Sequence, residues 1–231
     1  MPQYRIERLD FIPSGRRCNF CSRPLTSRVA YVLRDEKGNE CLSGPTCLST
    51  HARIDKSKEI YPNFAKACKG EIGDHKDVKA ATKREGAAKP KAEGHLEIEY
   101  LVLRFRQLGN LPGMKIKTLE EAYHRYVKTG QITDDDRLHI SRLIAKVSKE
   151  RPEYSPKNLT ACYAYMHWIK AALEDLHEDK QAFLRQMLFS LMKNLYLSPA
   201  QAAAVNKWFV KIEGAPVLDP EAFVPKQRST A

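Results

Sequence analysis

Four cysteines near the amino terminus constrain the fold of this chain more than any other feature. Cys18 and Cys21 form a Cys-x2-Cys pair, and nineteen residues separate it from a second pair, Cys41 and Cys47, which are spaced Cys-x5-Cys. Two such pairs can complete the tetrahedral shell of one zinc ion with little strain. The spacing therefore predicts one structural Zn2+ held by Cys18, Cys21, Cys41 and Cys47.

The segment between the two pairs strengthens this prediction. Residues 29–33 (Val-Ala-Tyr-Val-Leu) are typical of a strand, residues 35–38 of a turn, and residues 39–42 of the returning strand. After Cys41, either Ser43 or Gly44 can cap a helix whose first turn suits Pro45. A cysteine knuckle, a β-hairpin and a helix that carries the last ligand near its start make a treble-clef-like zinc module.

Other roles for these cysteines fit less well. A disulfide framework suits a secreted chain, yet no apolar segment behind the amino terminus resembles a signal peptide. Redox catalysis by Cys18 and Cys21 needs a thioredoxin-like βαβ pattern, and a catalytic zinc needs an open position beside a carboxylate or histidine. His51 lies four residues after Cys47 and could replace Cys41 as the fourth ligand. We expect reduced thiols and a cytoplasmic protein.

The net charge of +11, from 39 Lys and Arg against 28 Asp and Glu, is the second strong signal. This excess favours a polyanionic partner, and nucleic acid is the first candidate. The alternative is a basic surface that only keeps the protein in solution. A membrane partner is not expected, because no apolar run approaches the ~20 residues of a span and no helix pairs a basic face with an aromatic one.

The fold class predicted from the pattern is mainly α, with four regions along the chain. Residues 1–71 form the zinc-binding module, residues 72–94 a basic flexible linker, residues 95–214 an antiparallel helical bundle, and residues 215–231 an irregular tail. Apolar periodicity and end signals predict helices from about Leu96, Thr118, Thr133, Ser155, Lys180 and Ser198.

No constellation in the sequence supports catalysis. The run Asp134–Asp136 falls in the first turn of a predicted helix, where the helix dipole favours carboxylates, so we interpret it as a cap rather than a metal site. The histidines lack metal spacing, and there is no phosphate-binding glycine loop or nucleophile elbow. We therefore predict that the protein is not an enzyme.

Basic residues mark candidate nucleic-acid contacts in three places. Four arginines flank the first cysteine pair, two basic residues lie in the linker, and three follow one side of the helix after Thr133. A rigid cross-linked module can aim guanidinium groups at phosphates or guanine edges, and a helical stripe can follow a phosphate backbone. A solvated helix face is the alternative for the stripe. The candidates are Arg16, Arg17, Arg23, Arg28, Lys83, Arg84, Arg142, Lys146 and Lys149.

Together, these features resemble the large-subunit family of type IV CRISPR effector complexes. The resemblance rests on Cys18-Asn-Phe-Cys21, the hairpin through Tyr31, the turn that ends at Cys47 and the overall layout, with the motif itself confined to residues 16–52. It implies a subunit of a guide-RNA ribonucleoprotein that contacts repeated backbone subunits, helps recognise the motif flanking the DNA target and helps hold the opened duplex. Two alternatives stay open: a free-standing zinc-module DNA- or RNA-binding regulator or inhibitor from a mobile element, and a protein-interaction adaptor.

Overall fold

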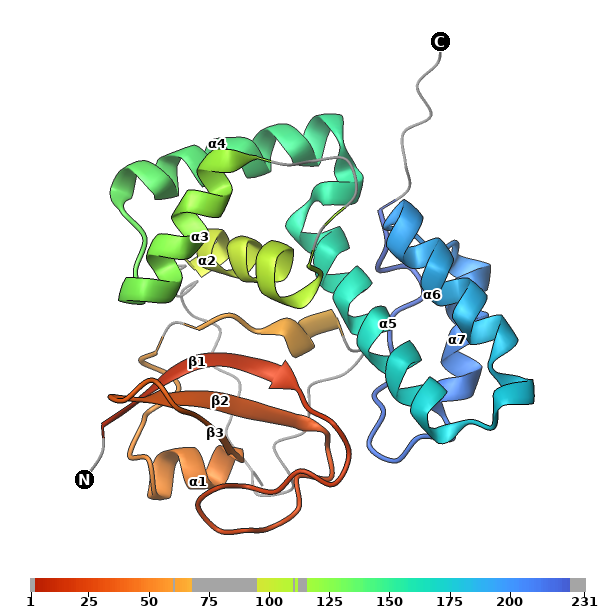
Figure 1. The fold of residues 1–231 in the computed structure, drawn as a ribbon, viewed down its shortest axis with the longest axis horizontal. Helices are drawn as coiled ribbons and strands as arrows, with labels where there is room; N and C mark the ends of the chain where they lie inside the picture. Colours follow the sequence, from red (N-terminus) through yellow and green to blue (C-terminus); the bar gives the residue numbers. More distant parts are fainter. Residues whose placement is uncertain (1–2, 60, 68–94, 110, 112–115, 225–231) are drawn as a thin grey trace, which may run out of the picture.

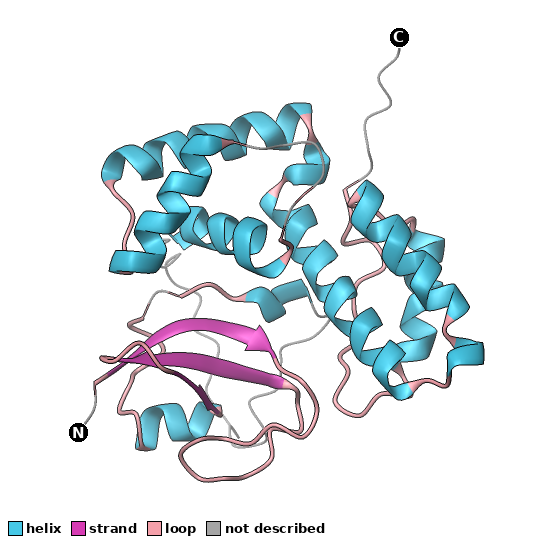
Figure 2. Cartoon of the chain, in the orientation of Figure 1, coloured by secondary structure: helices cyan, strands magenta, loops and turns pink. Residues whose placement is uncertain are grey.

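The computed structural model describes residues 3–59, 61–67, 95–109, 111 and 116–224. The molecule is mainly helical and has a small three-stranded antiparallel sheet near its amino terminus. Figure 2 shows the strands gathered at one end of the molecule, with most of the helices beyond them. The predicted linker at 72–94, with Lys83 and Arg84, lies outside the described residues.

The sheet consists of β1 (Tyr4–Phe11), β2 (Val29–Asp35) and β3 (Glu40–Ser43), in the order β1-β2-β3. The predicted hairpin is confirmed: Tyr31 pairs with Ser43, and the turn closes where Asp35 accepts hydrogen bonds from residues 37 and 39. Strand β1 was not predicted. It pairs antiparallel with β2 along its length, with one irregularity between Ile6 and Arg8.

Helix α1 (Pro45–Thr50) packs on one face of this sheet, and its N-cap is Gly44, one of the two candidates from the sequence. A small apolar cluster lies between them. Its buried members come from β1, β2, α1 and the loop that follows: Ile6, Tyr31, Leu33, Leu48 and Ile54. The sheet and α1 therefore form a compact unit even though α1 is short.

The helices of the remaining chain follow the predicted order. They are α2 (His95–Val102), which continues into a π-helical turn (Leu103–Gln107), α3 (Lys117–Thr129), α4 (Asp134–Glu150), α5 (Pro156–Asp175), α6 (Ala182–Asn194) and α7 (Pro199–Phe209). No helix in the described part of the chain has the length and apolar character that a membrane span requires.

Side-chain caps explain where three of these helices begin. Thr133, Ser155 and Ser198 each accept a hydrogen bond from a backbone N–H three residues later, as predicted. The predicted cap at Thr118 is wrong. Helix α3 begins after Ile116, and the Thr118 hydroxyl instead lies 2.9 Å from a ring nitrogen of His139 on α4.

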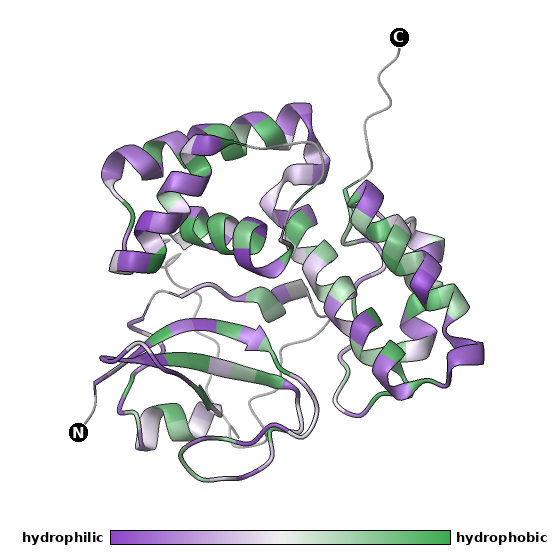
Figure 3. Ribbon diagram, in the orientation of Figure 1, coloured by the Kyte–Doolittle hydropathy of each residue, from purple (hydrophilic) through white to green (hydrophobic). Residues whose placement is uncertain are grey.

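Helix α5 is the centre of the packing. It runs between the group formed by the sheet and α2–α4 on one side and the pair α6 and α7 on the other (Figure 1). Trp168, Tyr165 and Ile169 on α5 are almost completely buried. Helix α2 is largely hydrophobic, whereas α3 and α4 carry many hydrophilic residues (Figure 3). On α4 Ile140 faces the core, while Leu138 on the same helix is 51% exposed.

The sheet and the helices share one continuous core. Phe11 of β1 and Val29 of β2 belong to the same apolar cluster as Trp168 and the α2–α7 side chains. The irregular segment after Gly214 also joins it, since Leu218 and Phe223 are buried and the Val224 N–H donates to the Asn158 side chain. The sheet and residues 215–224 are thus packed against the helices.

A network of charged side chains lies between the sheet and the helices. Arg8 and Asp10 on β1 are both buried, and the Arg8 guanidinium donates to Asp10 (2.8 Å) and to Glu40 (3.3 Å). Asp10 also accepts from the Tyr163 hydroxyl of α5 at 2.7 Å and from the Gln107 amide at 2.6 Å. Three arginines (8, 34 and 106) and three acids (7, 10 and 40) balance one another in this network.

Candidate metal centre and its basic surround

The first two cysteines sit in a tight knuckle. The Ser22 N–H donates to the Cys18 carbonyl at 2.9 Å, and the Cys18 N–H donates to the Arg23 carbonyl at 2.9 Å. Ser22 adopts a left-handed conformation, with φ of 57°, to close the turn. The knuckle brings Cys18 and Cys21 to one side of the loop, as the Cys-x2-Cys spacing predicts.

Helix α1 supplies the third thiol. Cys47 lies in its first turn, and the Sγ atoms of Cys18, Cys21 and Cys47 all lie within 4.8 Å of one another. In a tetrahedral zinc site with Zn–S bonds of about 2.3 Å the sulfurs are about 3.8 Å apart. Cys18 and Cys47 are buried and Cys21 is half-buried. Three thiols in this arrangement suit a metal ion that prefers sulfur ligands.

The surroundings favour a thiolate at Cys18. Burial opposes its ionisation, but the backbone N–H groups of Gly44, Phe20 and Cys21 donate toward its sulfur and lower the pKa of Cys18 to about 7. Burial raises the pKa of Cys47 to about 12, and the neighbouring Cys21 and Cys18 thiols add to this effect. Several thiolates this close together would repel one another, and a bound cation would offset that repulsion.

Cys41 lies beside the cluster but outside the group of three. It pairs with Leu33 in the sheet, so the two side chains share the face on which α1 packs. The knuckle binds β3 next to it: the Asn19 N–H donates to Leu42 O at 2.9 Å, and the Leu42 N–H donates back to the Asn19 side chain. Cys41 is thus on the correct side of the sheet for a fourth ligand.

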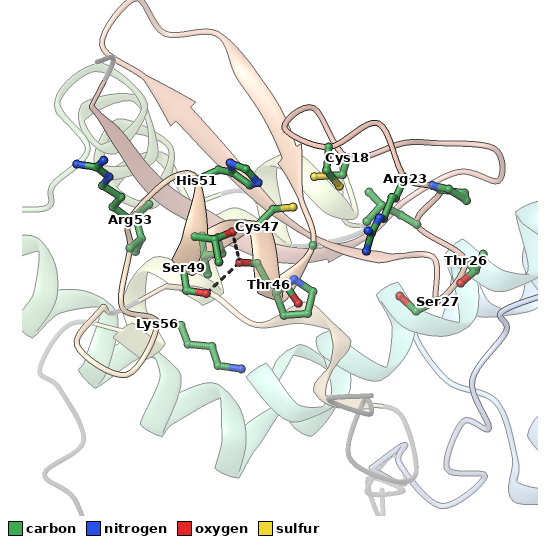
Figure 4. A pocket seen from close by; sticks show the side chains of 18 of the residues that line it. Cys18, Arg23, Thr26, Ser27, Thr46, Cys47, Ser49, His51, Arg53 and Lys56 are labelled. Carbon is green, nitrogen blue, oxygen red and sulfur yellow. Dashed lines mark hydrogen bonds between the residues drawn. The ribbon is translucent and has the colours of Figure 1, made fainter. Parts of the chain in front are cut away.

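His51 is the other candidate for that position. It follows the last turn of α1, its N–H donates to Cys47 O, and it is exposed. Its ring stacks on Phe20 of the knuckle, with centroids 6.2 Å apart and an angle of 7° between the planes. Figure 4 shows His51 on the same side of α1 as Cys47. The choice between Cys41 and His51 stays open at this point.

The arginines that flank the knuckle differ in exposure. Arg16, Arg17 and Arg23 are exposed, and Arg17 donates to the Ser22 carbonyl at 2.9 Å. Arg28 is only 5% exposed, and its guanidinium lies 4.8 Å from the ring centroid of Trp168. The expectation that Arg28 faces nucleic acid is therefore corrected: this arginine joins the knuckle loop to α5.

The loop that carries Arg23 is held at its far end as well. Gly214, at the turn after α7, has a φ of +74°, and a Cβ built there would lie 2.1 Å from the Thr26 carbonyl oxygen. Only glycine fits this approach without displacing the loop. The segment from Cys21 to Arg28 is thus fixed between the cysteine cluster, the turn at Gly214 and Trp168.

The predicted stripe on α4 is exposed, as expected. Arg142, Lys146 and Lys149 all lie on the outer side of the helix, and Lys146 has an ion pair with Glu150 at 3.9 Å. Helix α4 and helix α1 lie at opposite ends of the molecule (Figure 1). The stripe and the cysteine cluster are therefore two separate surfaces.

A hollow of about 1000 Å³ opens directly beside the three cysteines. The knuckle loop, α1 and the following loop line it, and three cations, Arg23, Arg53 and Lys56, line it against one carboxylate, Asp55. Figure 4 shows Arg23 and Lys56 on two sides of the start of α1, with Thr46 and Ser49 between them. Sequence reasoning missed Lys56, whose only signal was its place soon after the last cysteine.

Comparisons with known proteins give no relative from which a function can be transferred. No protein-family model, no curated protein and no solved structure matches this chain. The function of this chain is therefore inferred from its own residues.

Proposed function

We propose that the amino-terminal unit is a treble-clef-like zinc module in which Cys18, Cys21, Cys41 and Cys47 hold one structural Zn2+. Three of these thiols already lie together, and Cys41 is on the same face of the sheet. The ion would cross-link the knuckle, β3 and α1. The apolar cluster between the sheet and α1 is small, so the metal would add to the stability of this unit. The N–H groups directed at Cys18 are the kind of second shell that metal thiolates use.

The fourth ligand can be identified by ligand substitution. Elemental analysis of protein purified without added metal should give one zinc per chain. Cys41→Ser should lower the zinc content and His51→Gln should not. X-ray absorption at the zinc edge should report four sulfur neighbours. If zinc instead has three sulfur neighbours and one nitrogen neighbour, and Cys41→Ser retains zinc, the fourth ligand is His51 and not Cys41. Finding no zinc in the wild-type protein would refute the site.

We propose that the protein is a non-catalytic nucleic-acid-binding subunit of a guide-RNA ribonucleoprotein, as the resemblance to type IV CRISPR large subunits implies. The observation that carries this proposal is the set of exposed arginines on a loop fixed by the cysteine cluster. Fixed guanidinium groups lose little conformational freedom on binding, which favours defined contacts with phosphates or bases. The net charge of +11 favours the same class of partner.

The two exposed basic surfaces suit different tasks. Arg16 and Arg17 precede the first ligand, and Arg17 gives one of its N–H groups to Ser22 O while keeping others for a base. An arginine held in this way can make bidentate contacts with guanine and so help read a short flanking motif. The stripe of Arg142, Lys146 and Lys149 suits contacts with phosphates along a hybrid or a displaced strand.

A binding panel tests this division. The assembled complex is titrated with DNA targets that differ only in the flanking motif. Arg16→Ala or Arg17→Ala should compress the affinity ratio between permitted and forbidden flanks, because a bidentate arginine–guanine pair discriminates by about 1–3 kcal/mol. Lys146→Ala should weaken binding equally for all flanks. If both arginine variants keep the full affinity ratio between permitted and forbidden flanks, the knuckle does not read the flanking motif.

Co-purification tests the ribonucleoprotein itself. We expect tagged protein, expressed with its partner subunits, to retain a discrete guide-length RNA. Tight binding of duplex DNA by the isolated protein, with no RNA retained, would instead favour the free-standing regulator. Negligible affinity for any nucleic acid at low salt would favour the protein-interaction adaptor.

A further inference from the structure

The hollow beside the cysteine cluster has the chemistry of a phosphate site. Its lining holds three cations against one carboxylate, a formal excess of +2 (three minus one). That carboxylate, Asp55, accepts hydrogen bonds from the backbone and hydroxyl groups of Ser57 and has an ion pair with Lys58. The lining of the hollow thus carries more positive than negative formal charge.

Arg23 is the best placed of these cations. It is exposed, and among the residues that the structure describes it has no ion-pair partner. Its loop is held by the knuckle hydrogen bonds at one end and by the close approach of Gly214 to Thr26 at the other. Lys56 is exposed on the other side of α1, and Figure 4 shows Arg53 pointing away from the helix.

The hydroxyl groups between these two cations narrow the possible ligands. Ser49 and Thr50 both donate their hydroxyl hydrogens to the Thr46 carbonyl at 2.9 Å. They can therefore accept but not readily donate, which leaves Arg23 and Lys56 as the charged donors on either side of them. A phosphodiester carries one negative charge and strong acceptor oxygens, and an arginine fork matches its geometry.

We propose that this hollow binds the phosphate backbone of a nucleic-acid strand through Arg23 and Lys56. The inference rests on the proposed nucleic-acid function and deepens it, because it assigns Arg23 to a phosphate rather than to a base. The strand would pass over the start of α1, directly beside the metal centre. The metal cross-link then acts as the anchor that keeps both sides of the hollow in place.

The test compares five proteins by fluorescence anisotropy with labelled single-stranded RNA, single-stranded DNA and duplex DNA of two unrelated sequences. The proteins are the wild type, Arg23→Gln, Arg23→Lys, Lys56→Gln and the matched control Lys58→Gln. Lys58 lies two residues after Lys56, is exposed and does not line the hollow, and its ion pair with Asp55 at 3.7 Å is solvent-exposed and therefore weak. Zinc content and the thermal unfolding midpoint are measured for each protein, and Arg23→Lys serves as the conservative variant.

Each hollow variant should remove about one phosphate contact. For duplex DNA this lowers the slope of log affinity against log salt by about 0.9, or about 0.7 for a single strand. The loss should be the same for both sequences of each nucleic acid, Arg23→Lys should recover much of it, and Lys58→Gln should behave as wild type.

The outcomes separate this inference from the proposed function. If the wild type binds with a steep salt dependence but Arg23→Gln and Lys56→Gln match Lys58→Gln, the hollow is not the phosphate site and the nucleic-acid function stands. A loss confined to one sequence would return Arg23 to base reading and overturn the phosphate assignment. Absence of binding by the wild type at low salt would overturn both.

Discussion

Asp10 on β1 should contribute more to stability than any surface acid of this protein. Asp10 is 4% exposed, and its carboxylate accepts hydrogen bonds from Arg8 (2.8 Å), Tyr163 (2.7 Å), Gln107 (2.6 Å) and the Phe11 N–H (2.9 Å). These donors come from β1, α5 and the π-turn after α2, so the group joins the sheet to the helices.

Asp10→Ala leaves the Tyr163 hydroxyl buried without its partner and removes the shortest ion pair of Arg8, which keeps Glu7 and Glu40. Removing one member of a buried ion pair costs about 3–5 kcal/mol, and the loss should lie near the lower end because two partners of Arg8 remain. Tyr163→Phe removes one hydrogen bond to a charged group and should cost about 1.5–3 kcal/mol. Burial, with the Asp10 carboxylate next, raises the pKa of Tyr163, so its hydroxyl remains a donor at neutral pH. The double variant should lose less than the sum of the single losses, because the two groups contact each other.

Urea unfolding at pH 7 measures these losses, with the slope m checked for constancy. Asp134→Ala is the matched control, since its carboxylate is 95% exposed and has only an ion pair with Arg137 at 3.2 Å. The control should unfold close to the wild-type midpoint. The reasoning fails if Asp10→Ala unfolds within about 1 kcal/mol of the wild type, or if the two single losses with Tyr163→Phe are additive.

Three further predictions follow from other buried or paired groups. Burial opposes ionisation of Glu40, but hydrogen bonds from Arg106 and Arg8 lower its pKa from 4.5 to about 2, so its stabilisation is full above about pH 4.5 and is lost as the pH falls toward 2. The wild-type free energy of unfolding should therefore fall by about 1–2 kcal/mol over this range, after allowing for the partly exposed side chain of Glu40. Glu40→Gln should not show this fall, and a variant with the wild-type pH profile would contradict the prediction. Arg28→Ala should lower stability by about 0.5–2 kcal/mol and leave nucleic-acid affinity unchanged, whereas weaker binding by a folded variant would restore Arg28 to the contact surface. Asn158→Ala should cost about 2–4 kcal/mol in urea unfolding, because this completely buried amide donates to Leu195 O at 2.7 Å and accepts from the N–H of residue 224; a loss below that of a surface variant would argue against the contact.

Local chemistry made part of this structure predictable from sequence. The knuckle depends on Cys-x2-Cys spacing, and the hairpin on a four-residue turn. The starts of α4, α5 and α7 depend on Thr133, Ser155 and Ser198, each of which bonds a backbone group three residues away. Interactions of this short range are encoded within one stretch of sequence.

Long-range pairing made the remainder difficult to predict. Strand β1 lacks apolar alternation because Arg8 and Asp10 face inward, where they pair with each other and also contact Glu40 and Tyr163, which are remote in sequence. Arg28 resembled a surface arginine because Trp168, the ring that covers it, lies far along the chain. In each case at least one contact that permits burial of a charge comes from a residue remote in sequence.

The salt dependence of nucleic-acid affinity tests the central claim most directly. Zinc-loaded wild-type protein is titrated into labelled duplex DNA from about 50 mM to about 200 mM salt, the range over which phosphate contacts change affinity strongly. With at least three phosphates contacted, log affinity should fall against log salt with a slope of about −2.7 or steeper, a loss of about 40-fold over this range. A slope near zero, or no binding at the lowest salt, would contradict the account and leave the basic charge of this protein without a nucleic-acid role.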